Sequence, residues 1–363
     1  MQTFTLQSQY TRVAGVGVHE IHLERWMKTK MSLGEMESRL VRYAELRPCT
    51  TAFIDTRTPG SEQKENFTII GPGVAENPDQ HVHISIPHGF NIGGARQPPR
   101  CVNSQHSHET AEVFVVHTGI WRFKTGHDGA GSHVDLGPGD TISIPTQVFR
   151  GFENVGGDTG FMFAVLGGDD PGHVTWAPYV FEAAERYGLV LLESGRLVDS
   201  SREQVPEGAR RMPVTTAADL ARFKTVDSNS LTACTLKFDE LAPAGGLSSI
   251  PGFQECPIVG VANPSEQAPA GKMDWSHNFQ VRALLIAPGA TAPSHTRAEE
   301  EVLLVHSGNL TVAWPDGSLD LGPGDTLTVP IGIQRSYYNR TSQSSVVYVV
   351  RGGDHPKPAL WAQ

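Results

Sequence analysis

The chain reads HSHETAE over residues 106–112, and His106, His108 and Glu112 within it are residue types that bind divalent metals. Side chains alternate between the two faces of an extended segment, so His106 and His108 should project to the same side and grip one ion together. Glu112 begins a run, VFVV at 113–116, whose β-branched and aromatic residues predict a strand. The stretch therefore predicts two neighbouring strands that share a metal site of two imidazoles and one carboxylate, with coordination positions left open.

Turn residues follow this stretch, and both the stretch and its turn residues are repeated in altered form near the other end of the chain. Gly119 comes after Glu112, and GPGD at 137–140 is followed by Pro145 and Asn154. The later copy consists of His295, Glu301, Gly308, GPGD at 322–325, Pro330, Gly332 and Asn339. The copies are offset by 301 − 112 = 189 residues at the glutamate and by 322 − 137 = 185 at the GPGD turn, so the intervening loop is four residues longer in the first copy.

The duplication predicts two related β-structured units. Short strands separated by turns, in a chain with 38 Gly and 25 Pro, are typical of small barrels. The two-part motif resembles that of the cupin superfamily, and the resemblance covers most of the chain. It implies a bicupin: an all-β protein with two double-stranded β-helix (jelly-roll) barrels and a few peripheral helices.

Both copies depart from the cupin motif where it normally supplies a third metal-binding His. Arg150 occupies this position in the first copy and Arg335 in the second, and Arg297 also replaces the second His of the later copy. A guanidinium keeps its proton at ordinary pH and cannot ligate a metal. The resemblance thus implies one divalent ion, held by the ligands of the 106–112 stretch, and a second barrel without metal.

Two interpretations of Arg150 remain open at this point. It can lean over the pocket and bind an anionic group of the substrate, since a guanidinium matches a carboxylate with two hydrogen bonds. Alternatively, it pairs with Glu112 in a buried ion pair, and the site is a relic. In the second barrel, the favoured interpretation is a charge network of Arg297, Glu301 and Arg335.

The remaining segments divide the chain into four parts. Residues 1–65 are an N-terminal extension with one helix, expected over Ser32–Leu46 because Ser32 and Glu35 form a capping box. Residues 66–200 form the first barrel with a trailing helix at Pro178–Tyr187, 201–230 a linker, and 231–363 the second barrel.

Composition narrows the possible partners. The net charge of −10 and the absence of a Lys/Arg-rich block argue against nucleic acid. No apolar run approaches the roughly 20 residues that span a bilayer, and Met1–Thr5 does not resemble the start of a signal peptide. The four cysteines, Cys49, Cys101, Cys234 and Cys256, are widely spaced and suggest no disulfide framework. We expect a cytoplasmic protein that can form a homo-oligomer.

Alternation along the strands also predicts the substrate pocket. Phe114 and Val116 share the face of Glu112 and should form an apolar wall beside the metal. Arg96 lies on a strand that leads into the motif and is either a second anion contact or a surface charge. Gln147, which stands where the family has Gly, is expected to narrow the entrance or to hydrogen-bond the substrate.

Three histidines outside the motif require separate interpretations. His81 and His83 are also two residues apart on an expected strand and could face the first barrel's interior, but they lack a carboxylate at the family spacing. Counting from Glu112, His117 falls on the opposite face and is expected to be structural or exposed.

Three functions from different classes are compatible with these residues. The favoured one is an enzyme, an Fe(II) dioxygenase-type oxidoreductase acting on a small, possibly aromatic, carboxylate that Arg150 orients. Its layout is loosely similar to that of gentisate-type ring-cleaving dioxygenases. The second is a non-oxidative isomerase, decarboxylase or hydrolase with Mn, Zn or Ni, and the third is a non-catalytic bicupin that binds a small molecule.

Overall fold

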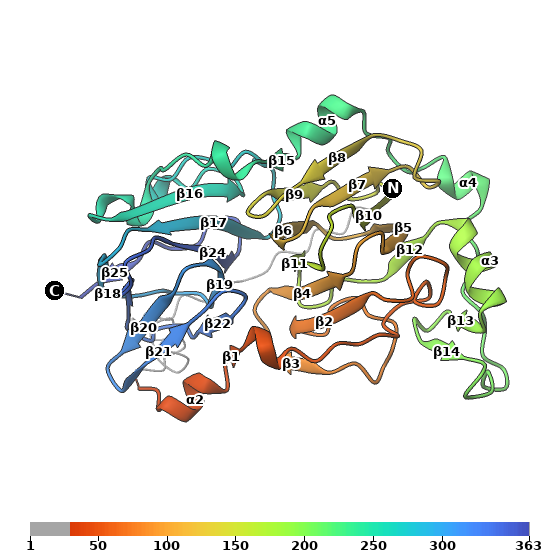
Figure 1. Ribbon diagram of the computed structural model, residues 1–363, viewed down its shortest axis with the longest axis horizontal. Helices are drawn as coiled ribbons and strands as arrows, with labels where there is room; N and C mark the ends of the chain where they lie inside the picture. Colours follow the sequence, from red (N-terminus) through yellow and green to blue (C-terminus); the bar gives the residue numbers. More distant parts are fainter. Residues whose placement is uncertain (1–29, 363) are drawn as a thin grey trace, which may run out of the picture.

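The computed structural model describes residues 30–362, which form two all-β units side by side with a few short helices at their edges (Figure 1). The first unit has a seven-stranded sheet in the order β15-β9-β6-β11-β4-β2-β3 and a five-stranded sheet in the order β12-β5-β10-β7-β8. Apart from β15, the strands are β2 Glu65–Ile70, β3 Val82–Ile84, β4 Phe90–Gln97, β5 Val102–His108, β6 Glu112–Thr118, β7 Trp121–Thr125, β8 His133–Leu136, β9 Thr141–Ile144, β10 Arg150–Asn154, β11 Gly160–Gly167 and β12 Val174–Trp176.

The second unit repeats this architecture. Its sheets have six strands, β1-β22-β19-β24-β17-β16, and five strands, β21-β20-β23-β18-β25. Apart from β1, these are β16 Phe253–Val259, β17 Phe279–Ile286, β18 Thr291–Thr296, β19 Glu301–Ser307, β20 Leu310–Trp314, β21 Gly317–Leu321, β22 Thr326–Val329, β23 Arg335–Tyr338, β24 Ser345–Gly352 and β25 Leu360–Trp361. The predicted all-β fold with two jelly rolls is confirmed.

The expectation of barrels needs one correction. In each unit the two sheets pack face to face around an apolar core, and each keeps its own edge strands, so the hydrogen-bonded ladder does not close. Phe114 on β6 packs against Phe123 on β7 and Phe152 on β10, with ring centroids 5.1 and 5.4 Å apart. Burial of one face of each sheet supplies the stability that closure would otherwise give.

The units meet through the outer faces of their larger sheets. Val113 and Val115 on β6 belong to the same apolar cluster as Val302 and Leu304 on β19. His117 was predicted to lie on the face opposite to Glu112. The contact between the units explains this orientation, because the His117 ring lies 5.5 Å from that of His306 in the second unit. His117 is therefore buried and structural.

Two short segments cross between the units. Strand β1 (Leu40–Val41), near the start of the described chain, pairs with β22 of the second unit, and β15 (Thr235–Leu236) pairs with β9 of the first. Each crossing strand is followed by a 3₁₀ turn, η1 (Tyr43–Glu45) or η2 (Phe238–Glu240). The units are therefore interlocked.

The GPGD turns receive these crossing segments. Asp325 accepts a hydrogen bond from the Tyr43 amide at 3.0 Å, and Asp140 accepts the equivalent bond from Phe238 at 2.9 Å. Gly139 has a φ of 88°, and a Cβ there would collide with the Phe238 ring. Glycine is required at this position both for the turn and for the contact.

The helices are peripheral. Helix α2 (Leu33–Glu37) has the predicted capping box of Ser32 and Glu35, but it ends well before Leu46, because Leu40–Val41 pairs with an open sheet edge instead. The trailing helix α3 (Pro178–Arg186) packs beside the β13–β14 hairpin (Leu189–Leu191 and Leu197–Asp199). Beyond it come the short helices α4 (Ala217–Leu220) and α5 (Ser228–Ala233), and two further 3₁₀ turns, η3 (Gly246–Ser249) and η4 (Pro264–Glu266).

Two other expectations concern the ends and the cysteines. Met1–Thr5, on which the signal-peptide prediction rests, lies outside the described residues. Among the described residues, no helix has the length and apolarity to cross a membrane. All four cysteines are unpaired.

Candidate metal centre

Two strands, one from each sheet of the first unit, bring the predicted ligands together. His106 and His108 lie on β5, where His106 is paired in register with Arg150 on β10 and with Trp176 on β12. Glu112 is the first residue of β6 in the facing sheet. One potential ligand atom from each of the three side chains lies within 4.8 Å of the others, and all three residues are buried.

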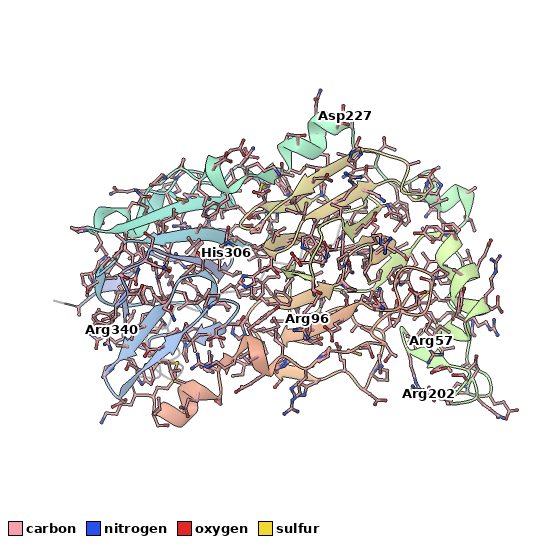
Figure 2. The ribbon with its side chains drawn as sticks, viewed as in Figure 1. Arg57, Arg96, Arg202, Asp227, His306 and Arg340 are labelled. Atoms are coloured by element: carbon pink, nitrogen blue, oxygen red, sulfur yellow. The ribbon has the colours of Figure 1, made fainter. Side chains whose placement is uncertain are left out.

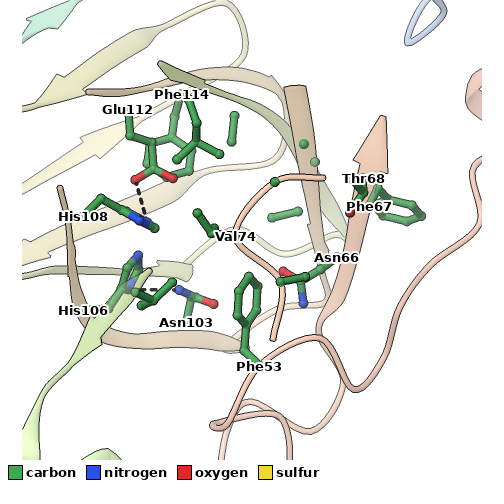
Figure 3. A pocket seen from close by; sticks show the side chains of 18 of the residues that line it. Phe53, Asn66, Phe67, Thr68, Val74, Asn103, His106, His108, Glu112 and Phe114 are labelled. Carbon is green, nitrogen blue, oxygen red and sulfur yellow. Dashed lines mark hydrogen bonds and ion pairs between the residues drawn. The ribbon is translucent and has the colours of Figure 1, made fainter. Parts of the chain in front are cut away.

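The three side chains line one wall of a cavity inside the first unit (Figure 3). Most of the remaining wall is apolar and aromatic, with Phe53, Val74, Phe114, Phe152, Leu166, Val174 and Trp176 among its residues. A cavity that is largely apolar with a few convergent polar groups is the usual form of a small-molecule site.

Burial keeps both imidazoles neutral. Burial, helped by the Arg150 guanidinium, lowers the pKa of His106 to about 3 and that of His108 well below its ordinary value. The Nδ1 atom of His106 lies 2.7 Å from the Ser104 carbonyl oxygen, to which it donates, leaving the Nε2 lone pair free. Such a hydrogen bond is how proteins fix the tautomer of a metal-binding His.

Arg150 pairs with Glu112, as the second interpretation of its role predicted. Its Nη2 and Nε atoms donate to Glu112 Oε2 at 2.5 and 3.2 Å, and the side chain is fully buried. Arg150 is not among the residues that line the cavity. Burial raises the pKa of the Glu112 carboxyl, and the charge of Arg150 opposes that rise.

The donor set fits a divalent ion. Two neutral imidazoles and a carboxylate converge, and Glu112 Oε1 accepts no hydrogen bond from any described residue, so one carboxylate oxygen stays available. His108 Nε2 lies 3.5 Å from Glu112 Oε2, while its Nδ1 atom is buried without a partner. Because Arg150 cancels the charge of Glu112, a bound ion would keep its double positive charge and attract an anion.

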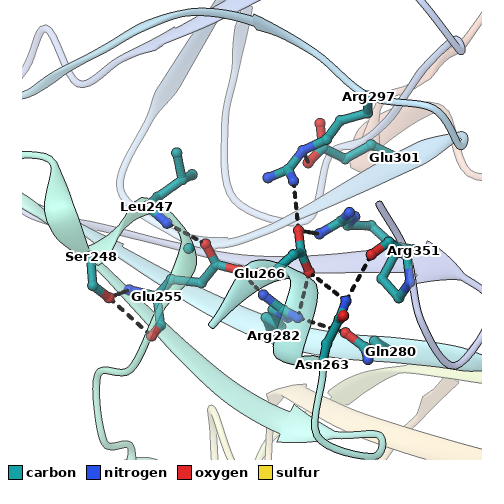
Figure 4. Close-up of polar contacts among 12 residues, drawn as sticks. Leu247, Ser248, Glu255, Asn263, Glu266, Gln280, Arg282, Arg297, Glu301 and Arg351 are labelled. Carbon is teal, nitrogen blue, oxygen red and sulfur yellow. Dashed lines mark hydrogen bonds and ion pairs between the residues drawn. The ribbon is translucent and has the colours of Figure 1, made fainter. Parts of the chain in front are cut away.

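The second unit has a different centre at the equivalent place. There, Arg297 lies 3.4 Å from Glu301 and donates to Glu266 at 3.0 Å. Glu266 also accepts from Arg351 at 2.7 Å and from Arg282 at 2.9 Å, as Figure 4 shows. Burial alone would raise the pKa of Glu301, but Arg297 and Arg335 lower it to about 2.

The predicted charge network of the second unit is therefore present. In the part of the chain that the structure describes, the only metal-type cluster is the one in the first unit.

Comparisons with known proteins agree with this architecture. A family model described as a cupin domain matches residues 283–351. The oxalate decarboxylase of Lactobacillus farciminis, solved as a formate complex, superposes with a TM-score of 0.55 at 12% identity, covering 92% of this chain and 90% of that one. The chain therefore has a bicupin fold, with two units of the cupin architecture.

A second solved structure gives the same result for this bicupin. The oxalate decarboxylase of Bacillus subtilis at pH 4.6 superposes with a TM-score of 0.53 at 12% identity, covering 98% of this chain and 87% of that one. No curated protein matches the bicupin in sequence. At this identity, the structural likeness concerns the fold.

The residues predicted as substrate contacts are distributed unevenly in the bicupin. Phe114 lines the cavity. Val116 faces the same interior but is fully buried in the core deeper in the unit. Arg96 lies outside the cavity, because its Nε donates to Glu65 at 2.5 Å and its guanidinium lies over the Phe67 ring. Gln147 has a left-handed φ of 62° and lines a separate surface hollow.

The second histidine pair also lies away from the centre. His81 and His83 are at the edge strand β3, with rings 4.5 Å apart, and neither lines the cavity. His83 accepts a hydrogen bond from the Arg47 amide at 3.1 Å and lies 2.8 Å from the Thr68 carbonyl oxygen. His83 is therefore a hydrogen-bonded strand residue, and His81 precedes the strand.

Sequence reasoning missed several residues around the centre. Asn103 lies 3.3 Å from His106 Nδ1 and accepts a hydrogen bond at 2.9 Å from the buried Lys64, which also pairs with Asp55. Trp176 packs its ring 5.3 Å from that of His106. A signal for Trp176 existed in the repeat, because Trp361 follows it by 361 − 176 = 185 residues and packs on His295 in the same way.

Proposed function

We propose that this bicupin is a metal-dependent enzyme that carries out non-oxidative chemistry, decarboxylation above all, on a small carboxylate bound in its first unit. The observation that carries the proposal is the convergence of His106, His108 and Glu112 at the wall of an apolar cavity. The fold shared with oxalate decarboxylases supports this reaction class over dioxygen chemistry. The shared fold therefore favours the predicted alternative, a non-oxidative metal-dependent enzyme, over the Fe(II) dioxygenase.

The chain's own residues would have distinct tasks. A divalent ion at this centre would supply a Lewis acid for the carboxylate. His106 and His108 would hold it as neutral ligands, and Glu112 would add one carboxylate oxygen. Arg150 is a positioning residue here, because it holds Glu112 through Oε2. The aromatic walls exclude water, which strengthens electrostatic interactions inside the cavity.

The proposed reaction has a simple balance. The bond between the carboxylate carbon and the rest of the substrate breaks, CO₂ leaves, and a proton takes up the electron pair that remains. No oxidant is consumed. Dioxygen uptake therefore separates this reaction from the dioxygenase alternative.

Anaerobic reconstitution tests the proposal. Protein reloaded in this way with Mn²⁺, Fe²⁺, Ni²⁺ or Zn²⁺ would then be moved to air-saturated buffer and incubated with a panel of carboxylates while CO₂ release and dioxygen uptake are followed together. We expect CO₂ without dioxygen uptake, loss of turnover in His106→Ala/His108→Ala, and retained turnover in the matched pair His81→Ala/His83→Ala. Stoichiometric dioxygen uptake would instead support the dioxygenase hypothesis. Absence of both bound metal and turnover would favour a non-catalytic binding protein.

A further inference from the structure

The cavity beside the metal centre contains no permanently charged Lys or Arg to receive a second negative charge. None of the described residues that line it is Lys or Arg. The nearby cations are already engaged: Arg150 with Glu112, Lys64 with Asp55, and Arg96 with Glu65 outside the cavity. A substrate anion would therefore meet positive charge only at the metal, and a second carboxylate too far away to reach the same ion would lie against apolar walls at a high desolvation cost.

The interior face of the larger sheet gives the cavity a flat floor. Gly93 on β4, Ala164 on β11 and Phe114 on β6 lie side by side in register. A Cβ built on Gly93 would lie 3.1 Å from the Phe67 carbonyl oxygen and within 4 Å of no side-chain atom, so no side chain packs over this glycine. Phe53 and Trp176, which pack edge to face with centroids 5.9 Å apart, also line the cavity. Small residues flanked by aromatic rings leave room for a planar apolar group.

Asn66 supplies a polar group within this apolar surface. Its Nδ2 atom is buried and has no hydrogen-bond partner in the protein. Figure 3 shows the Asn66 amide on the side of the cavity away from His106 and His108. A buried amide donor without a partner is costly unless a ligand or water satisfies it. Asn66 is thus placed to donate to an oxygen at the end of a ligand whose other end reaches the metal centre.

We propose that the cavity selects a monocarboxylate with a planar, aromatic body and a neutral hydrogen-bond acceptor at its far end, and that Asn66 is the residue that recognises this acceptor. Dicarboxylates whose second carboxylate cannot also reach the ion, such as terephthalate, are excluded from this class, because the cavity offers that charge no partner. This inference rests on the proposed function for the carboxylate end of the ligand. The apolar body and the acceptor are argued from the cavity alone.

Calorimetric titration of acetate, terephthalate, benzoate, and 3- and 4-acetylbenzoate tests this assignment. The full chain would be used both loaded with Zn²⁺, which has no redox chemistry, and free of metal. We expect benzoate to bind the loaded protein at least about tenfold tighter than acetate. Terephthalate, whose second carboxylate cannot reach the same ion, should bind more weakly than benzoate. Terephthalate binding as tightly as benzoate would overturn the proposal.

Two variants locate the ligand within the cavity. Asn66→Ala should weaken binding of the preferred acetylbenzoate about two- to tenfold and leave benzoate unchanged. Ala164→Leu, which fills the floor, should weaken benzoate and leave acetate unchanged. Asn229→Ala, at an exposed position on α5, is the matched control. Equal weakening of benzoate and acetylbenzoate in Asn66→Ala, or no weakening of either, would remove Asn66 from recognition.

The outcomes separate this inference from the proposed function. If the protein takes up no metal yet still prefers benzoate to terephthalate, the proposed function fails and the selectivity of the cavity stands. If the protein binds metal and releases CO₂ from terephthalate, which it binds as tightly as benzoate, the proposed function stands and this inference fails.

Discussion

The two units of the molecule share one fold but have different centres. In the first unit His106, His108 and Glu112 face a cavity, and Arg150 lies behind the carboxylate. In the second, Arg297 takes the place of the second imidazole, and Tyr337, equivalent to Phe152, donates to Glu301 and fills space beside it. One exchange of His for Arg thus replaces a potential metal ligand with a fixed cation, and the surrounding residues form an ion-pair network.

Breaking this network should have the largest effect on stability. Glu266→Ala would leave Arg282, Arg297 and Arg351 without their shared carboxylate. Removal of one partner from a buried ion pair costs about 3–5 kcal/mol, and we expect a loss of this order in the free energy of unfolding measured with denaturant. The exposed Glu207→Ala should change it by less than about 0.5 kcal/mol. Similar values for both variants would mean that the network does not stabilise the second unit.

Acid should weaken the contact that joins the units. Burial, with the neighbouring His306, lowers the pKa of His117 to about 4. Below pH 6.5 the unfolded chain binds more protons than the folded one, so stability should fall as pH drops toward 4, by up to about 1.4 kcal/mol per pH unit for this His. The pKa values of buried His106, His108 and His295 are also lowered, so these residues reduce stability further as the pH falls.

Denaturant titrations at several pH values isolate the contribution of the contact. His117→Gln/His306→Gln should show a shallower loss of stability between pH 6.5 and 4 than the wild type. Parallel curves for the two proteins would show that these imidazoles do not titrate on unfolding in this range.

A smaller but more specific effect should come from restoring the missing ligand. Arg150→His would recreate the full cupin ligand set and remove a positive charge, so metal affinity should rise by about tenfold or more. Arg335→His is the matched change in the second unit, where Arg297 remains, and it should create no metal site. Competition with a chelator measures both. Equal gains in the two variants would contradict the distinction between the units.

The parts of this structure that depend on local spacing could be predicted from the sequence. The duplication, the all-β fold and the placement of the His106 and His108 side chains on the same face of one strand follow from motifs a few residues long. The crossing strands β1 and β15 could not be predicted, because a strand of two residues does not specify a partner strand some 285 or 95 positions away.

The candidate site shows the same limit. The spacing of residues in the sequence does not show whether the Arg150 side chain points toward Glu112 or into the substrate cavity. Asn66 carries no motif, and only the assembled cavity brings it opposite the two histidines.

Metal content per chain tests the central claim most directly. Wild-type protein reconstituted with a divalent ion and freed of excess should retain one ion per chain by elemental analysis. His106→Ala/His108→Ala should retain none, and His295→Ala in the second unit should retain as much as the wild type. Wild-type protein without a bound ion, or an ion that persists in the double variant, would contradict the claim that the first unit holds the metal centre.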